Sequence, residues 1–147
     1  GDVYKRQERE GGEILYGGKR PSLESPFDEG SFLEPTIVSN LDYQSRTATE
    51  EIFGPVVTLH KFEKDEDAVE MANCTEYGLA GSVWTSDSAR GKSLAEKIET
   101  GMVWINTWLH RDLRVPFGGV KNSGVGTEGG RWSLSFFSQP VNICVKE

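Results

Sequence analysis

The segment from residue 56 to residue 106 alternates between short apolar runs and helical patterns, and this alternation constrains the fold more than any other feature. The expected strands are 56–62, 81–85 and 102–106. The expected helices are 65–78, which begins at Asp65, and 87–101, which is capped by Ser86 or Asp87 and ends at a left-handed Gly101. This order of elements is typical of α/β units with helices packed over a parallel sheet. We therefore predict an α/β fold built on a mainly parallel βαβαβ sheet.

The segments on either side of this unit are less regular. Glycine and proline punctuate residues 8–35, with strand candidates at Glu13–Tyr16 and 32–38. Residues 107–130 are expected to form an extended loop, and a structureless stretch of that length inside a compact domain is usually functional or disordered. A helical stretch at 131–137 comes after it.

The two ends of the chain are treated apart from the main body, residues 8–137. Residues 1–7 join awkwardly to the glycine-rich stretch after them and are set aside as a helix tail or a non-native leader. In 138–147, the apolar residues alternate with polar ones: Val141, Ile143 and Val145. This pattern predicts a strand, either at the edge of this chain's own sheet or paired with a sheet edge in another subunit.

Composition and charge exclude several classes of protein. The 147 residues carry 23 acidic and 16 basic side chains, which gives a net charge of −7. A negatively charged chain has no positive electrostatic field that would attract nucleic acid, so nucleic acid is not expected as a partner. No apolar run approaches the ~20 residues of a membrane span. The two cysteines, Cys74 and Cys144, make no disulfide framework and have no basic neighbours that would activate a thiolate. His60 and His110 each stand alone, so we expect no metal site. The lack of a disulfide framework indicates reduced thiols, and we therefore expect a cytoplasmic protein.

Two stretches carry side chains suited to ligand binding. In Glu50-Glu51-Ile52-Phe53-Gly54-Pro55, a carboxylate can accept hydrogen bonds from a sugar diol, and Phe53 can lie against a flat ring. In Trp108-Leu109-His110-Arg111-Asp112-Leu113-Arg114, which comes after the third expected strand, Arg111 can hold a carboxylate in a bidentate manner. The alternative is that Arg111 pairs with Asp112 or with another surface acid.

Four motifs, in this order and at this spacing, resemble the aldehyde dehydrogenase family. They are Glu50-Glu51-Ile52-Phe53-Gly54-Pro55-Val56, Tyr77-Gly78-Leu79-Ala80, Gly101-Met102-Val103-Trp104-Ile105-Asn106 and Pro116-Phe117-Gly118-Gly119-Val120-Lys121-Asn122-Ser123-Gly124. The resemblance extends from about residue 8 to the end and is to the C-terminal part of the catalytic domain and its oligomerisation strand. It implies that the coenzyme domain, the nucleophilic cysteine and the general-base glutamate belong to a part that precedes these residues, so that this segment alone is inactive.

The resemblance also implies roles for individual residues in the NAD- or NADP-dependent oxidation of an aldehyde. Glu51 would bind the nicotinamide ribose and Phe53 would pack by the nicotinamide, although the coenzyme is held mainly by the preceding part. Phe117 would line the aldehyde pocket, and Glu128 is a candidate proton relay. The usual arginine before that glutamate is Thr127 here. The tail would join a neighbouring subunit in a homodimer or homotetramer, although Gln139-Pro140 departs from the usual threonine-glutamate pattern.

The stretch from Asn106 to Arg114 is most similar to the 2-aminomuconic and 2-hydroxymuconic semialdehyde dehydrogenases. In that group an arginine at the place of Arg111 is thought to grip the remote carboxylate of the substrate, and Trp108 belongs to the same substrate-binding stretch. Two alternatives remain open. One is an aldehyde dehydrogenase of another substrate class, such as betaine or aliphatic aldehydes, and the other is a non-catalytic oligomerisation or binding module.

Overall fold

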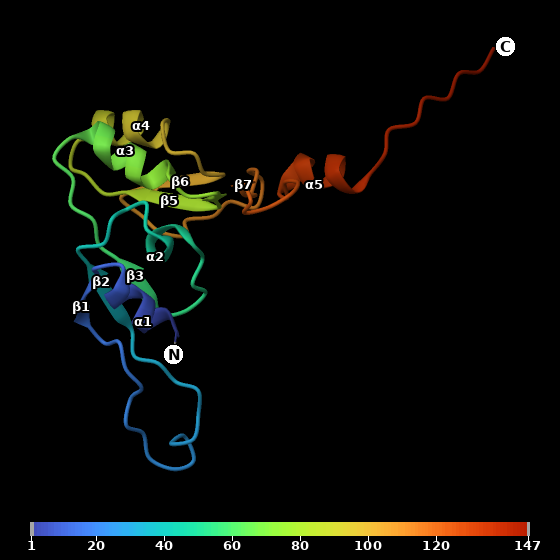
Figure 1. Cartoon of the computed structure of the whole chain (residues 1–147). Helices are drawn as coiled ribbons and strands as arrows, with labels where there is room; N and C mark the ends of the chain where they lie inside the picture. Colours follow the sequence, from blue (N-terminus) through green and yellow to red (C-terminus); the bar gives the residue numbers. More distant parts are fainter. Residues whose placement is uncertain (1, 147) are drawn as a thin grey trace. The chain divides into compact units, whose positions relative to one another are not determined.

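The structure, a computed structural model, describes residues 2–146, with side chains from Arg6 onward. The chain forms two compact units, one up to Thr75 and the other from Glu76 onward. Figure 1 colours the chain from blue at its beginning to red at its end. Both units combine short strands with helices, which agrees with the predicted α/β class.

The first unit is built on a three-stranded mixed sheet in the order β1–β2–β3. Its elements are α1 (Asp2–Arg9), β1 (Glu13–Tyr16), β2 (Thr36–Ser39), α2 (Arg46–Thr49), β3 (Val56–Thr58) and α3 (Asp65–Asn73). Strand β1 runs antiparallel to β2, and β3 runs parallel to it. Because β2 is the central strand, its Val38 is completely buried. Leu41, just beyond β2, is buried as well.

A long loop, residues 17–35, joins β1 to β2 and closes on itself at its base (Figure 1). Gly17 adopts a φ of 72°, and a Cβ there would lie 2.1 Å from the Pro35 carbonyl oxygen. Glycine alone fits this close approach. The Gly18 N–H donates to Thr36 Oγ1 at 2.9 Å, so the two ends of the loop are fixed to each other.

The second unit contains the β5–α4–β6 arrangement that positions the candidate site. Its elements are β4 (Tyr77–Gly78), β5 (Ala80–Val83), α4 (Ser88–Ala95), β6 (Met102–Ile105), β7 (Val120–Lys121) and α5 (Gly130–Phe137). Strands β5 and β6 are parallel, and α4 packs against both of them. Helix α4 starts where expected, because Asp87 Oδ1 accepts from the N–H groups of Ala89 and Arg90.

The predicted single βαβαβ sheet is wrong. The βαβ unit of β5, α4 and β6 forms as expected, but β3 pairs with β2 and not with β5 or β6. The fold is therefore mixed α/β with three small sheets in the part of the chain that is described. Apolar periodicity identifies a strand but carries no information about its partner, which explains the error.

Two further expectations need correction. The expected loop 107–130 contains β7, which pairs antiparallel with β4, and a bridge between Phe117 and Glu128. Helix α4 ends at Ala95 with a right-handed Glu96 as its C-cap, and Gly101 is not left-handed. Glycine is required at 101 for another reason, a close approach to the chain at Gly118.

The two ends of the chain differ in structure. Residues 2–7, which the sequence-based prediction set aside, lie within α1. Residues 138–146 run away from α5 without pairing to any strand of the described chain (Figure 1). Their apolar side chains are largely exposed, at 79% for Val141, 82% for Ile143 and 81% for Val145. A strand formed with another subunit stays a prediction.

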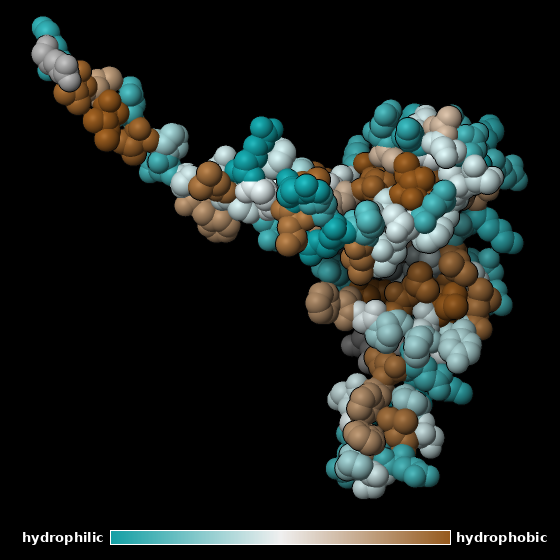
Figure 2. All heavy atoms as spheres, turned by 180° about the vertical axis from the view of Figure 1, so that it is seen from behind, coloured by the Kyte–Doolittle hydropathy of each residue, from teal (hydrophilic) through white to brown (hydrophobic). Residues whose placement is uncertain are grey.

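Little apolar surface is fully buried in either unit. Among the described side chains, the only buried apolar ones are Val38 and Leu41, whereas large apolar side chains are exposed in both units. Figure 2 shows such apolar surface along the projecting end of the chain. Among residues 2–146, no helix is long and apolar enough to cross a membrane.

Candidate functional site

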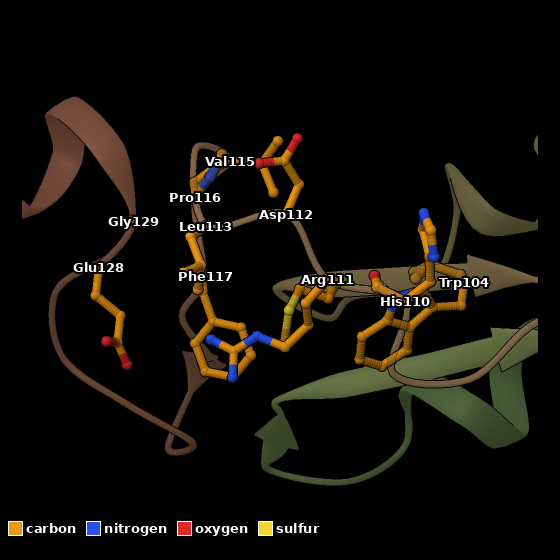
Figure 3. A pocket seen from close by; sticks show the side chains of 12 residues that line it. Trp104, His110, Arg111, Asp112, Leu113, Val115, Pro116, Phe117, Glu128 and Gly129 are labelled. Carbon is orange, nitrogen blue, oxygen red and sulfur yellow. Dashed lines mark hydrogen bonds between the residues drawn. The ribbon is translucent and has the colours of Figure 1, made fainter.

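A pocket of about 230 Å³ lies beside β6 and the segments that come after it in the second unit. Figure 3 shows this pocket from close by. Its described lining residues are Met102, Val103, Trp104, His110, Arg111, Asp112, Leu113, Val115, Pro116, Phe117, Glu128 and Gly129. The segment that leads into the pocket starts at the carboxyl end of a parallel strand, where ligands of α/β sheets are expected.

Asn106 marks the point where the chain leaves the β5–β6 sheet. Its side-chain amide donates to the Thr85 carbonyl at 2.7 Å and accepts from the Thr85 N–H at 2.8 Å. The side chain thus replaces the backbone groups that another strand residue would supply. Because its backbone has a φ of 54°, the main chain turns away at this residue. The sheet therefore ends at a defined residue, and the loop to Arg111 begins there.

Two tryptophans support this loop. Trp104, in β6, donates its indole N–H to the His110 carbonyl at 2.9 Å. The ring of Trp108 packs against that of Trp104, with 5.1 Å between the centroids. Leu109, between Trp108 and His110, also has a left-handed backbone, with a φ of 54°. The chain therefore folds back over β6 and brings Arg111 to the pocket.

The Arg111 guanidinium lies over the ring of Phe117, 4.0 Å from its centroid (Figure 3). Among the described residues, no carboxylate pairs with it. The nearby Asp112 pairs instead with Arg114, which donates from Nε at 2.9 Å and from Nη2 at 2.5 Å. These bonds hold the pKa of the Asp112 carboxyl below its usual value. The guanidinium N–H donors of Arg111 are thus not used in an ion pair and are able to bind a ligand. The alternative pairing of Arg111 with Asp112 is not formed.

Glu128 faces the same pocket from the chain opposite Phe117. The two residues exchange backbone hydrogen bonds, from Phe117 N to Glu128 O at 2.7 Å and from Glu128 N to Phe117 O at 2.8 Å. This bridge fixes the backbone from which the exposed Glu128 side chain extends, at the edge of the pocket that holds the guanidinium. A cation, an apolar ring and a carboxylate that surround one small cavity can bind a substrate with both charged and apolar parts.

Three of the sequence motifs meet at a close junction beside the pocket. The Gly101 N–H donates to the Gly78 carbonyl at 3.0 Å, and the Gly78 N–H donates to Ser123 Oγ at 2.9 Å. A Cβ at Gly101 would lie 1.6 Å from the Gly118 carbonyl oxygen. Since Gly118 comes directly after Phe117, this junction constrains the backbone from which the Phe117 side chain extends.

Glu51 and Phe53 lie in the first unit, on the turn between α2 and β3. Phe53 is 92% exposed and has a φ of 51°, a left-handed conformation that is rare for a bulky side chain. Glu51 is exposed and bonds to no other described residue. The neighbouring Pro55 carbonyl accepts from the Thr36 N–H at 2.7 Å, which fixes the turn to β2. An exposed carboxylate and an exposed aromatic ring therefore lie on the same turn.

The six residues predicted from the sequence fall into three groups. Arg111, Phe117 and Glu128 line one pocket. Trp108 is not among the described lining residues and packs behind them, against Trp104. Glu51 and Phe53 share a turn in the other unit.

Sequence reasoning missed several lining residues. The main ones are Met102 and Trp104, in β6, and His110, which directly precedes Arg111. The useful signal for Trp104 was its place two residues before Asn106, on the face of the strand that it shares with Met102.

No group of three or more potential metal ligands occurs among the described residues. Cys74 donates its thiol to the Met71 carbonyl at 3.0 Å, and Cys144 lies exposed in the tail. The described residues that line the pocket include no cysteine.

Residues 1–143 match the Aldehyde dehydrogenase family. The chain is 43% identical, over 143 residues, to the 2-hydroxymuconic semialdehyde dehydrogenase of Pseudomonas sp. (strain CF600), covering 97% of this chain and 29% of that protein. It is 42% identical, over 144 residues, to the human 2-aminomuconic semialdehyde dehydrogenase, covering 97% of this chain and 30% of that protein.

A solved structure of similar fold is the betaine aldehyde dehydrogenase of Staphylococcus aureus, a point mutant in complex with NAD⁺. It matches with a TM-score of 0.86 and 37% identity, covering 99% of this chain and 32% of that one. The chain therefore spans about a third of the length of the proteins it resembles.

Proposed function

Because this chain belongs to the aldehyde dehydrogenase family, we propose that its pocket receives the substrate of an NAD-dependent oxidation of a carboxylated semialdehyde to the acid. The substrate class proposed is 2-hydroxymuconate or 2-aminomuconate 6-semialdehyde. The observation that carries the proposal is the unpaired guanidinium of Arg111, held over Phe117 in a small pocket. The curated relatives at 42–43% identity act on such semialdehydes, which supports the same substrate class.

Arg111 would bind the remote carboxylate of the substrate. Its guanidinium has the planar fork that matches a carboxylate, and its partner Phe117 limits how the guanidinium can turn. The aliphatic part of the substrate would lie against Phe117. Glu128, fixed by its backbone bridge to Phe117, would accept or pass on a proton at its carboxylate oxygens. A betaine aldehyde, which carries a positive charge, would be repelled by this arginine, and this disfavours that substrate class.

The turn with Glu51 and Phe53 fits a nicotinamide nucleotide, because it carries an exposed carboxylate and an exposed aromatic ring. Glu51 would accept hydrogen bonds from the ribose hydroxyls, and Phe53 would lie against the nicotinamide ring. When bound, NAD⁺ accepts the hydride from the substrate. The chain spans 29% of the length of its Pseudomonas relative, and the pocket is lined by no cysteine among its described residues. We therefore assign the thiol nucleophile to a part of the enzyme outside these 147 residues.

We also propose that the full-length enzyme is a cytoplasmic homo-oligomer that pairs through residues 138–147. Val141, Ile143 and Val145 alternate along the tail and are all more than three-quarters exposed. An extended segment with unpaired backbone groups and one apolar edge is suited to adding a strand to another sheet. Removal of residues 138–147 would then reduce the oligomer to a smaller species, which analytical ultracentrifugation measures.

The test of substrate class uses two aldehydes that differ only in the remote carboxylate, 6-oxohexanoate and hexanal. In the full-length enzyme, Arg111→Ala is expected to raise KM for 6-oxohexanoate by about 10- to 100-fold. This factor corresponds to the free energy that a charge-assisted hydrogen bond contributes to binding. The KM for hexanal should change little. Arg131→Ala is the matched control, because Arg131 is an exposed arginine whose guanidinium also lies over an aromatic ring, 4.6 Å from the centroid of Trp132, and it does not line the pocket. Equal losses on both aldehydes after Arg111→Ala would contradict the proposal.

A further inference from the structure

We propose that Trp104 is a positioning residue for Arg111, and that its indole N–H makes the pocket selective for a carboxylated aldehyde. This inference rests on the proposed function of Arg111. Its structural basis is the hydrogen bond from Trp104 Nε1 to the His110 carbonyl at 2.9 Å. His110 precedes Arg111 directly, so the bond fixes the peptide group from which Arg111 extends. Figure 3 shows Trp104, His110 and Arg111 together at one end of the pocket.

The loop between Asn106 and Arg111 needs such a support. Asn106 and Leu109 both have a φ of 54°, in the left-handed region that costs energy for residues other than glycine. The local backbone preference therefore opposes this conformation, and contacts from outside the loop must hold it. Asn106 holds the start of the loop through its two bonds to Thr85. Trp104 holds its end.

Trp104 acts on the loop in two ways. Its ring packs against Trp108 within the loop, and its N–H binds the carbonyl just before Arg111. The ring contact has no single preferred direction, whereas the hydrogen bond has one and sets the orientation of a single peptide group. Loss of the N–H alone should leave the loop packed but let the Arg111 backbone rotate.

Such a rotation would affect charged and uncharged substrates differently. A bidentate contact between a guanidinium and a carboxylate depends on the angle and position of both groups. An uncharged aldehyde makes no such contact, so a displaced Arg111 would leave its binding unchanged. The indole N–H therefore contributes to selectivity between substrates, and not to the chemical step.

The test compares Trp104→Phe with Trp84→Phe in the full-length enzyme. Phenylalanine keeps a six-membered aromatic ring at this position and removes the N–H donor together with the pyrrole ring. The KM for hexanal reports the lost ring volume, and the ratio of the two KM values reports the lost hydrogen bond. Trp84 is a suitable control because it is 67% exposed, donates its own indole N–H to Ser82 Oγ at 3.2 Å, and does not line the pocket. Trp104→Phe should raise the ratio of KM for 6-oxohexanoate to KM for hexanal by about 3- to 10-fold. Trp84→Phe should not change this ratio.

Measuring Arg111→Ala in the same series separates the two proposals. If Arg111→Ala raises KM for 6-oxohexanoate selectively but Trp104→Phe does not, the positioning role is wrong and the carboxylate contact stands. If neither variant is selective, both proposals are wrong.

A second measurement needs no variant and covers the case in which Trp104→Phe does not fold. In ¹⁵N-tryptophan-labelled protein, the indole proton of Trp104 should exchange with solvent about tenfold or more slowly than that of Trp108, because a hydrogen-bonded proton is protected. Trp108 is 57% exposed, and its indole has no acceptor among the described residues. Equal exchange rates for the two indoles would overturn the proposed bond.

Discussion

Substitution of Gly101 by alanine tests how tightly the pocket depends on the junction of the three motifs. An alanine Cβ would lie 1.6 Å from the Gly118 carbonyl oxygen and 2.7 Å from its carbon. An ordinary contact begins near 3.4 Å, so the carbonyl must retreat by about 1.8 Å. Both atoms belong to the backbone, which cannot rotate away as a flexible side chain would. The φ of Gly101 is accessible to alanine, so the clash is the whole effect.

This displacement affects both stability and activity. Overpacking of this kind costs about 3 kcal/mol, at the upper end of the usual range because backbone must move. For a chain of this length, that lowers Tm by about 6–12 °C. Phe117 adjoins Gly118 and would move with it, and a shift of about 1 Å in a substrate-positioning group can lower the rate about 100-fold. We expect kcat/KM in the full-length enzyme to fall by about that factor.

Gly81→Ala is the matched control. Gly81 lies on β5 and pairs with Val103 of β6, and a Cβ there would meet Ile98 and Thr100 side chains at 3.6 and 3.8 Å, which are ordinary contacts. Thermal unfolding followed by circular dichroism measures the stability of the chain, and steady-state kinetics measures the activity of the full-length enzyme. If Gly101→Ala behaves like Gly81→Ala in both assays, the proposed junction does not hold Phe117 in place.

Two further predictions concern the first unit. Gln7 is completely buried and both polar atoms of its amide lack a described partner, so Gln7→Met should raise the free energy of unfolding by about 1–3 kcal/mol, measured by urea denaturation. The exposed Gln44→Met should be neutral and serves as its control. Hydrogen bonds from Arg46 hold the pKa of the Glu50 carboxyl below its ordinary value of 4.5. Its stabilising effect is therefore complete above pH 4.5 and is lost as the pH falls through the lower folded pKa, so Glu50→Gln should flatten the acid limb of a plot of Tm against pH.

Local patterns in the sequence predicted the elements that local chemistry determines. Strand β1 has the predicted bounds, and Asp87 was one of the two candidates for the cap of α4. In both cases the decisive information lies within a few residues, as an apolar run between glycines or as a side chain that binds the next N–H groups. The β5–α4–β6 unit could be predicted from the same information, because one helix between two strands restricts how they can pair.

Features that depend on distant residues were not predicted. Strand β3 pairs with β2, which comes after the long loop closed at Gly17. Nothing in the sequence of β3 indicates that β2 is its partner. Strand β7 has only two residues, and it is a strand because it pairs with β4. It contains no apolar run from which it could be predicted. Gly101 was identified as special, but the sequence suggested a left-handed helix end where the structure shows a steric contact.

The candidate site shows the same division. The place of Arg111 in the pocket could be predicted from its position beyond a parallel strand. The hydrogen bond from Trp104 to the loop could not be predicted, although its strand face could, because an aromatic side chain within a strand is normally assigned to the core. Its N–H finds an acceptor only because the loop turns back at two left-handed residues, which periodicity does not predict.

The amide bonds of Asn106 have a consequence for protein engineering. Because a side chain closes the hydrogen-bond ladder of β5 and β6 at Thr85, the residues after Asn106 can change in number and type without altering the register of the two strands. The segment from Thr107 to Leu113 can thus be exchanged as long as its far end keeps two contacts, from Trp104 Nε1 to the His110 carbonyl at 2.9 Å and from the Gly130 N–H to the Leu113 carbonyl at 3.0 Å. Grafting segments of other lengths between Asn106 and Arg114 offers a direct route to new aldehyde preferences, provided that Asn106 itself and these two contacts are kept.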